Sequence, residues 1–459
     1  RMTKDEPSES SFYKDVLGSP RFIVAPMVDQ SELAWRMLSR KHGAHLCYTP
    51  MIHSCLFVND PKYRKEALQT CSEDKPLIVQ FCGNDPKILL QAGILVQDMC
   101  SDCLAIDINL GCPQAIARKG HYGAFLQDEW DLIASIVSTL SKNLRLPVTC
   151  KVRIFEDMSK TLRYAQMLEK AGCKLLTVHG RTREQKGPLT GLADWRYVKT
   201  IREHLNIPIF SNGNIQCLQD VERCLEETGV QGVMTAEGNL YNPALFEGRS
   251  PVTWDICKEY LDLVELYPCP SSFVRGHLFK MLHHLLAIPS NSECRERIAT
   301  GQNIEDFRNV VRDLEVKYRP IHEGQVAYVE EHQDDTKECT KSFNLNIPPW
   351  LCHSYIRLPP EEHMQKLQEA QKRAEDPNGV KRVFYDDDGN QISRKKMKKL
   401  RRINRRPPKH ESTRVFSLCV VCHNPVGLRC SFVMCKNCCR NDFITRNTEC
   451  GAHRILKKR

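Results

Sequence analysis

Long hydrophobic runs are missing from this sequence of 459 residues. No stretch of about 18 apolar residues occurs, and the polar residues 1–9 do not look like a secretory signal. We therefore expect no membrane span and a cytoplasmic and/or nuclear location. In such a reducing compartment the 23 cysteines should be free, catalytic or metal-bound rather than paired in disulfides.

A G-x-G-x-x-G fingerprint is also missing, so nothing supports a doubly wound open sheet, which is the alternative α/β fold. What is present is a repeated pattern in which a short apolar run of strand length precedes a segment with helical periodicity. The eight apolar runs cover residues 22–25, 46–49, 77–81, 104–108, 148–152, 175–178, 207–210 and 230–235. Eight such alternations within residues 21–246 predict a (β/α)8 TIM barrel, whose usual size is about 250 residues.

The segments between these runs carry apolar residues at helical spacing. They cover residues 31–42, 85–99, 128–142, 161–171 and 218–228. Gly43, Gly172 and Gly229 stand where helix C-caps belong, which supports the helix assignments.

Charge separates the end of the chain from the rest. Residues 1–393 carry 47 Lys and Arg against 53 Asp and Glu, whereas residues 394–459 carry 19 against 3. The tract 394–409 holds ten basic residues and no acidic one. Such a tract predicts a polyanionic partner such as RNA, and a nuclear localisation signal is a compatible alternative.

These shifts in composition predict five segments. They are an N-terminal extension over 1–20, the barrel over 21–246, a helical domain over 247–345, a disordered charged and basic linker over 346–415 and a Cys-rich module over 416–459. Within the helical domain, residues 252–267 and 272–286 are predicted to be amphipathic helices. Residues 294–317 are predicted to be a further helix pair or one long helix.

The C-terminal module has too few apolar side chains to form a core unaided, which is the usual circumstance of a structural zinc module. Its seven cysteines and one histidine, all candidate ligands, are Cys419, Cys422, Cys430, Cys435, Cys438, Cys439, Cys450 and His453. Two C-x-x-C pairs at the spacing of zinc knuckles predict one or two zinc ions and leave the ligand pairing open. A redox C-x-x-C is the weaker alternative, because no thioredoxin-like strand precedes it.

Polar residues follow several predicted strands, at the end where barrel enzymes keep their sites. The junction 104–113 is the most informative, because Asn109 and Cys112 come directly after an apolar strand. The other strand-end residues are Pro26, Met27, Val28, Gln80, Lys151, Arg153, His179, Asn212, Gly213, Asn214, Ala236, Glu237 and Gly238. Each alone has an ordinary explanation, such as a turn glycine, a core histidine or a solvated basic pair. Their convergence on one rim favours an active site.

Eight sequence blocks carry a resemblance to a known family. The blocks are residues 25–31, 80–86, 106–113, 119–124, 151–153, 178–183, 212–213 and 232–243. In this order they resemble the FMN-dependent tRNA dihydrouridine synthases, over roughly the first 340 residues. Position 237 is Glu, where many bacterial members carry Arg, and this form resembles the eukaryotic branch that acts on positions 16 and 17 of the tRNA D-loop.

The resemblance implies reduction of uridine with FMN as the cofactor and NADPH or NADH as the reductant. It implies that Cys112 donates a proton to uracil C5, and an ordinary thiol, with a pKa of about 8.5, is protonated at neutral pH as this role requires. Asn109 and Arg153 are implied to bind the uracil. The other strand-end residues are implied to hold FMN, with Glu237 contributing only its backbone because a carboxylate repels phosphate.

Two other functions stay open at this point. A tRNA-binding or scaffold protein with a catalytically silent barrel would use the basic tract and the zinc module as its working parts. Another FMN barrel oxidoreductase, of the dihydroorotate or dihydropyrimidine type, would also place a thiol near flavin but would not need the basic tail. The expected macromolecular partner is tRNA, and no obligate protein partner is evident.

Overall fold

The computed structural model divides into two compact units, residues 1–377 and 378–459. It describes residues 12–329, 347–355, 357–375, 384–385, 391–392, 417–422, 424, 426, 430–446, 449–453 and 455. The basic tract 394–409 lies outside these residues. In the part that is described, no helix is long and apolar enough to cross a membrane.

Eight parallel strands form a closed barrel in the first unit. They are β1 (Phe22–Val24), β2 (Leu46–Tyr48), β4 (Leu77–Cys82), β5 (Cys103–Leu110), β6 (Val148–Arg153), β7 (Leu176–His179), β8 (Ile209–Asn212) and β9 (Gly232–Thr235). β9 pairs back with β1, and β2 pairs with both β1 and β4, so the ring has no open edge. The predicted TIM barrel is confirmed and the doubly wound sheet is excluded. A two-residue strand, β3 (Ile52–His53), pairs with β4 and was not predicted.

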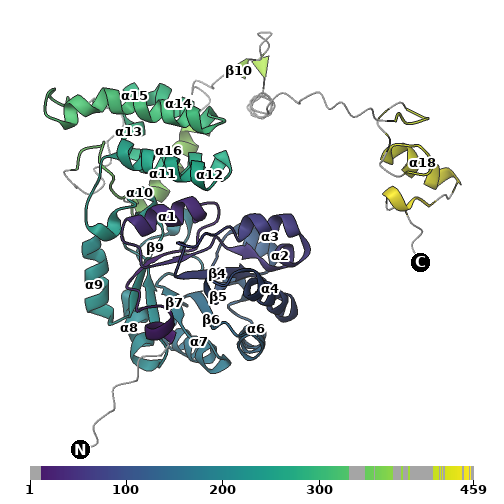
Figure 1. Cartoon of the computed structure of the whole chain (residues 1–459), viewed down its shortest axis with the longest axis horizontal. Coiled ribbons are helices and arrows are strands. Elements are labelled where there is room, and N and C mark those ends of the chain that lie inside the picture. The colour runs from purple at the N-terminus through teal and green to yellow at the C-terminus, as the bar shows by residue number, and fades with distance from the viewer. Residues whose placement is uncertain are drawn as a thin grey trace, which may run out of the picture. The chain divides into compact units, whose positions relative to one another are not determined.

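Helices surround the barrel (Figure 1). They include α1 (Leu33–Lys41), α2 (Ser54–Asn59), α3 (Pro61–Ala67), α4 (Pro86–Met99), α6 (Trp130–Asn143), α7 (Met158–Ala171), α8 (Trp195–His204) and α9 (Leu218–Thr228). Asp85 and Asp157 cap the helices that follow them, and Gly172 (φ +109°) and Gly229 (φ +65°) end α7 and α9 in the left-handed conformation. Five of these helices lie in segments predicted from the sequence, whereas α2, α3 and α8 were not predicted.

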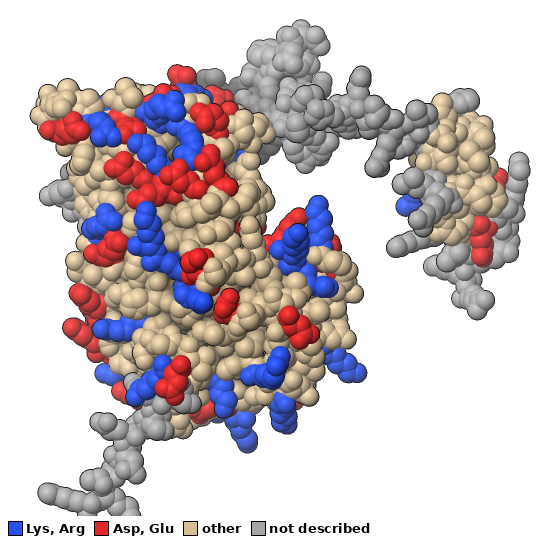
Figure 2. Space-filling model, in the orientation of Figure 1, with Lys and Arg blue, Asp and Glu red and all other residues tan. Residues whose placement is uncertain are grey.

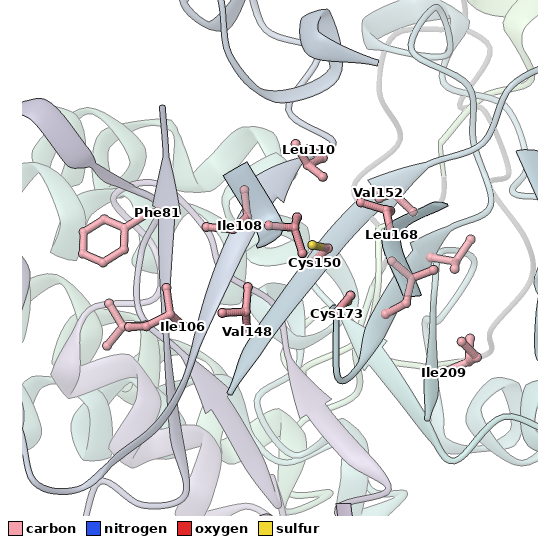
Figure 3. Close-up of a cluster of buried hydrophobic side chains, with 14 of the residues drawn as sticks. Phe81, Ile106, Ile108, Leu110, Val148, Cys150, Val152, Leu168, Cys173 and Ile209 are labelled. Atoms are coloured by element: carbon pink, nitrogen blue, oxygen red, sulfur yellow. The ribbon is translucent and has the colours of Figure 1, made fainter. Parts of the chain in front are cut away.

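The strands bury side chains on both faces. Figure 3 shows Phe81, Ile106, Ile108 and Val148 on the faces of neighbouring strands that the surrounding helices cover. The inward faces are apolar at the strand beginnings, where Ile23, Ile78 and Phe210 meet, and polar toward the strand ends. Because both faces are buried, the strands hold their register firmly and fix the side chains at their ends.

Residues 12–17, within the predicted N-terminal extension, pack against the apolar end of the barrel interior. Phe12, Tyr13 and Leu17 are buried there, and the Tyr13 hydroxyl donates to the Gln231 carbonyl at 2.9 Å. This end of the barrel is therefore closed by side chains, and a ligand would have access only from the polar end.

A second set of helices lies along one side of the barrel (Figure 1). It comprises α11 (Thr253–Leu266), α12 (Ser271–Met281), α13 (His283–Ala287), α14 (Ser292–Thr300) and α15 (Ile304–His322). Their core includes Trp35 from α1 of the barrel, stacked on His277 at 4.0 Å between ring centroids. Residues 294–317 form a helix pair, broken at Gly301, and the predicted helix 272–286 is interrupted at Leu282.

The first residues of the predicted linker pack against this helical core. Trp350 and Cys352 are buried in it, and the Thr253 amide donates to the Trp350 carbonyl at 2.9 Å. A further helix, α16 (Pro360–Glu375), follows. The segment 347–355 thus returns the chain toward the polar end of the barrel.

The second unit contains a two-strand hairpin and the Cys-rich module. β10 (Phe384–Tyr385) pairs antiparallel with β11 (Gln391–Ile392), and α18 covers Lys436–Arg446. The buried cluster of the module consists of Cys430, Cys439, Cys450 and Ile455. Cysteines therefore take the place of an ordinary apolar core.

Candidate active site and metal-binding cluster

The strand register brings the predicted residues of β5 to β8 side by side. Asn109 is opposite Lys151 and His179 is opposite Asn212, at the polar end of the barrel. The Lys151 ammonium donates to Asn212 Oδ1 at 2.9 Å. The structure thus gathers these four side chains at the barrel mouth.

Lys151 forms no ion pair with any described residue, although it is partly buried at the mouth. Burial lowers its pKa to about 8, helped by the neighbouring charge of Arg153. An ammonium has three protons, and only one is used by Asn212. The remaining two can serve acceptors of a bound ligand.

The turn that carries Cys112 is held from two sides. Asn109 Oδ1 accepts the Cys112 amide proton at 2.9 Å, and the Ala124 amide donates to the Cys112 carbonyl at 3.1 Å. The second contact needs Gly123, because a Cβ on that residue would come within 2.8 Å of the Cys112 carbonyl oxygen. The side chain of Cys112 packs against Tyr122 and Cys82 and stays partly exposed.

Arg153 braces two loops at the mouth. Its Nε donates to the Gly111 carbonyl at 2.9 Å and its Nη1 to the Thr182 carbonyl at 2.7 Å. The side chain is buried, and burial lowers its pKa to about 10, so it is still charged at neutral pH. The guanidinium therefore links the Cys112 turn to the loop after β7.

His179 is held as a neutral imidazole. Arg181 Nη1 lies 3.0 Å from its Nε2, and because a guanidinium can only donate, Nε2 must accept. Burial and the charges of Arg153 and Lys151 keep the His179 pKa well below its ordinary value. The proton consequently stays on Nδ1, which is then a hydrogen-bond donor.

The loop after β8 depends on a glycine and an asparagine. A Cβ on Gly213 (φ +118°) would come within 2.6 Å of Ala193 Cβ, so this close approach excludes larger residues. Asn214 Oδ1 accepts from the Ala193 amide at 2.8 Å and from Arg181 Nη2 at 3.2 Å, and its Nδ2 donates to the Ala193 carbonyl at 2.7 Å. The Asn214 side chain thus shapes the loop.

The turn after β9 is equally tight, since a Cβ on Gly238 would clash with the Ile215 carbonyl oxygen. Glu237, at the start of α10 (Glu237–Tyr241), is paired with Arg357 through Nε at 3.0 Å and Nη2 at 2.7 Å. Arg357 was not predicted as a site residue, because it is 120 residues away from Glu237 and belongs to no motif. Arg357 reaches Glu237 because the segment after the helical core brings the polypeptide back to the barrel mouth.

The remaining predicted residues lie at the same rim. The Met27 amide donates to Ser31 Oγ at 3.0 Å, and the Met27 side chain packs against the barrel interior and the helical core. Pro26 is half-buried, Val28 is exposed, and Ala236 packs on the barrel interior. Gln80 is fully buried, so its amide is reached only from inside the barrel.

The cysteine-rich module brings all eight predicted ligands into two groups. Cys419, Cys422, Cys435 and Cys438 form one, and Cys430, Cys439, Cys450 and His453 form the other. Within each group the ligand atoms lie within 4.8 Å of one another, close enough to hold a metal ion. The two groups interleave along the chain, because Cys430 lies between the two pairs of the first group. Spacing alone could not reveal this pairing.

The fold and the polar rim define an α/β-barrel protein with its site at the carboxyl ends of the strands, as in barrel enzymes. The sequence profile described as Dihydrouridine synthase (Dus) matches residues 23–316, and the chain belongs to this family. The match covers the barrel and the helices α11 to α15 almost completely.

Several curated proteins are similar over most of their length. A Mus musculus protein named tRNA-dihydrouridine(16/17) synthase, NAD(P)(+)-like, is 48% identical over 97% of this chain and 90% of its own. The Schizosaccharomyces pombe tRNA-dihydrouridine(16/17) synthase is 44% identical over 75% of this chain and 90% of its own. A mouse tRNA-dihydrouridine(20a/20b) synthase-like protein is 36% identical over 57% of this chain and 80% of its own.

Proposed function

We propose that this protein reduces uridine to 5,6-dihydrouridine at positions 16 and 17 of the tRNA D-loop, using FMN and NADPH or NADH. The family membership supports the reaction, and the names of the more similar relatives support the positions and a nicotinamide reductant. The observation that carries the proposal is the gathering of Asn109, Cys112, Lys151 and His179 at one barrel mouth.

The donors at the mouth fit FMN. Lys151 keeps two unused protons in a partly buried position without a carboxylate partner among the described residues, and His179 offers its Nδ1 proton. These donors suit the carbonyl and nitrogen edge of an isoalloxazine ring, and the Lys151 charge favours its anionic reduced form. Bound FMN would supply the hydride for uracil C6, which no side chain can provide.

Cys112 would donate the proton to uracil C5 as the general acid. Its turn is fixed by Asn109, whose amide would also hold the uracil edge. Arg153 would act beside the uracil while bracing the same turn through the Gly111 carbonyl. Gln80, Pro26, Met27 and Val28 would line the flavin ring.

The loops after β8 and β9 would hold the phosphate. Asn212, Gly213, Ala236 and Gly238 offer closely packed backbone there. The carboxylate of Glu237 would repel a phosphate, but Arg357 neutralises it through a bidentate ion pair. Arg357 would therefore cancel the repulsion that an unpaired Glu237 would exert on the phosphate. Asn214 would contribute indirectly, by shaping the loop.

Each Cys-rich group would bind one zinc ion, giving two structural sites per chain. Thiolate and imidazole ligands are those that zinc prefers, and four ligands complete a tetrahedral site without an open position. The module would then stabilise the chain end that carries the basic tract.

The basic tract 394–409 would contact tRNA phosphates in a sequence-independent way. Figure 2 shows Lys and Arg interspersed with Asp and Glu on the visible face of the first unit, so that face offers no continuous basic surface. The concentration of positive charge in residues 394–459 favours this tract as the electrostatic tRNA contact. A cytoplasmic and/or nuclear location is part of the proposal, since the tract also suits nuclear import.

Mapping dihydrouridine in tRNA by mass spectrometry tests the proposal. Cells that lack the protein should lose dihydrouridine at positions 16 and 17, and wild-type protein should restore it. Complementation with Cys112→Ala should fail although the flavin-loaded barrel is present, which would distinguish an enzyme from a tRNA-binding scaffold. Unchanged modification in the deletion cells would refute the proposal.

A further inference from the structure

A buried carboxylate inside the barrel was not among the predicted site residues. Asp107 on β5 is fully buried, with Oδ1 accepting from the Thr149 hydroxyl at 2.6 Å and Oδ2 accepting from Gln80 Nε2 at 2.7 Å. Burial raises the pKa of Asp107 to about 6, while the two hydrogen bonds oppose the rise, so the group is ionised at neutral pH. It offers acceptors only.

A chain of hydrogen bonds runs from this carboxylate to the Cys112 turn. Gln80 Oε1 accepts from Asn109 Nδ2 at 2.9 Å. Asn109 Oδ1 accepts from the amides of Cys112 at 2.9 Å and Gly111 at 3.2 Å. Each link sets the orientation of the next, because an amide side chain has a donor on one side and an acceptor on the other.

The donor-to-acceptor direction of this hydrogen-bond chain is fixed at both of its ends. Asp107 can only accept, so Gln80 must present its nitrogen to it and its oxygen to Asn109. Asn109 must then present its nitrogen to Gln80 and its oxygen to the two backbone N–H groups. Reversal of either amide would place a donor against a donor in a buried site, which costs about 1–3 kcal/mol per unsatisfied group.

We propose that Asp107 is a positioning residue, which acts through Gln80 to orient the Asn109 amide and so holds the turn that carries Cys112. The orientation has a second consequence for ligands. Asn109 keeps one unused amide proton, and its oxygen already accepts from two backbone amides, so it presents a donor to a ligand. The mouth is thereby set to bind carbonyl edges, such as those of uracil and isoalloxazine. The catalytic part of this inference rests on the proposed function.

Substitutions that nearly keep the size of the side chain can test the direction in which these hydrogen bonds run. In Asp107→Asn, the remaining side-chain oxygen can still accept from Gln80 while the new amide nitrogen donates to Thr149, whose hydroxyl can rotate to accept. In Thr149→Val, Asp107 still accepts from Gln80. In Asp107→Leu, which is close in size, no acceptor faces Gln80 Nε2, so this end of the hydrogen-bond chain is lost and Gln80 no longer orients Asn109.

We therefore expect the variants that keep an acceptor for Gln80 to differ from the variant that removes it. Hydrogen exchange, followed by mass spectrometry on peptides covering residues 109–113, should stay within about threefold of wild type in Asp107→Asn and in Thr149→Val. It should be at least about tenfold faster in Asp107→Leu, which corresponds to about 1.4 kcal/mol at 25 °C. The rate of dihydrouridine formation should fall in the same order, with kcat affected more than KM.

Exchange in Asp107→Leu that stays within about threefold of wild type would overturn the proposal. So would exchange in Asp107→Asn as fast as in Asp107→Leu, since the remaining side-chain oxygen of Asp107→Asn can still accept from Gln80. The exchange measurement needs no tRNA, so it also separates this inference from the proposed function. Wild-type protein that makes no dihydrouridine would refute the function, while the exchange rates would still decide the role of Asp107.

Discussion

The barrel mouth and the Cys-rich module reach functional geometry by opposite routes. The mouth collects side chains from Met27 to Arg357, and buried strand faces and loop contacts hold them. The module collects its ligands from residues 419–453, and three of the four residues in its buried cluster are themselves candidate ligands. The mouth is therefore supported by a core that is independent of its chemistry, whereas the module has almost no core besides its ligands.

This difference predicts different responses to mutation. Replacing a polar residue at the mouth should lower the activity and leave the barrel folded, because the apolar core of the barrel is unchanged. Replacing a ligand in the module should remove the fold itself, because the metal must supply the folding free energy.

The largest effect is expected for Cys112→Ala. Dihydrouridine formation should fall by about 10²–10⁴-fold, the usual contribution of a general acid. FMN content and reduction of the flavin by NADPH should be nearly unchanged, because the thiol acts only on uracil. Single-turnover assays measure the two steps separately. The control Cys71→Ala, at a partly exposed thiol in the loop that precedes β4, should behave as wild type, and full turnover in Cys112→Ala would remove Cys112 from the mechanism.

Loss of metal is expected for Cys435→Ser, which removes one ligand of the first group. Metal analysis should give two zinc ions for wild type and fewer for the variant, because a structural site contributes of the order of 10 kcal/mol. The bound FMN should remain. Cys217→Ser, at an exposed cysteine outside the module, is the matched control. Fresh protein without zinc, with all seven module thiols freely titratable, would contradict the proposal.

Removal of residues 394–459 should weaken tRNA binding and flatten its salt dependence. Each lost phosphate contact lowers the slope of log K against log salt by about 0.7–0.9. Replacing Lys and Arg of 394–409 by Gln should reproduce the change with the module intact. Flavin reduction by NADPH serves as the control and should not change. Identical slopes for full-length and truncated protein would mean that the tract contacts something other than RNA.

A smaller effect is expected for Arg357→Ala, because the ion pair with Glu237 is partly exposed. FMN binding to apoprotein, followed by flavin fluorescence, should weaken by about three- to tenfold, since the carboxylate then faces the phosphate unpaired. Adding Glu237→Gln should recover most of the affinity. Arg196→Ala, at an arginine paired with Asp194, is the control. An unchanged affinity in Arg357→Ala would exclude this arginine from the phosphate site.

The smallest effect concerns pH and Lys151. Its folded-state pKa of about 8 is below the ordinary 10.5, so the unfolded chain binds more protons between these values. This group therefore makes the apoprotein more stable as pH rises through that window. FMN affinity should fall over the same rise, because the ammonium deprotonates. Lys151→Met should remove both trends, and chemical denaturation and FMN titrations at pH 7 and 9 measure them. Identical pH trends in wild type and variant would exclude Lys151.

Much of the fold was predictable because it is encoded locally. The eight apolar runs and the C-cap glycines Gly172 and Gly229 follow from periodicity and backbone preference. The missed elements carry weaker signals: β3 has two residues, and α8 follows a loop rich in turn residues. Strand ends were a good guide to the rim, because in a closed parallel barrel all of them meet at one end.

The sequence by itself determined the residue types available: a strand that ends in Asn109 and Cys112, glycines after the last strands, and eight thiol and imidazole ligands in a short segment. Only the tertiary structure decided which of these meet. Register placed Gln80 opposite Asp107, the return of the chain brought Arg357 to Glu237, and folding of the module interleaved the two ligand groups. The physical reason is that hydrogen bonds and ion pairs depend on distances between atoms, and for residues far apart in the chain those distances are set by packing.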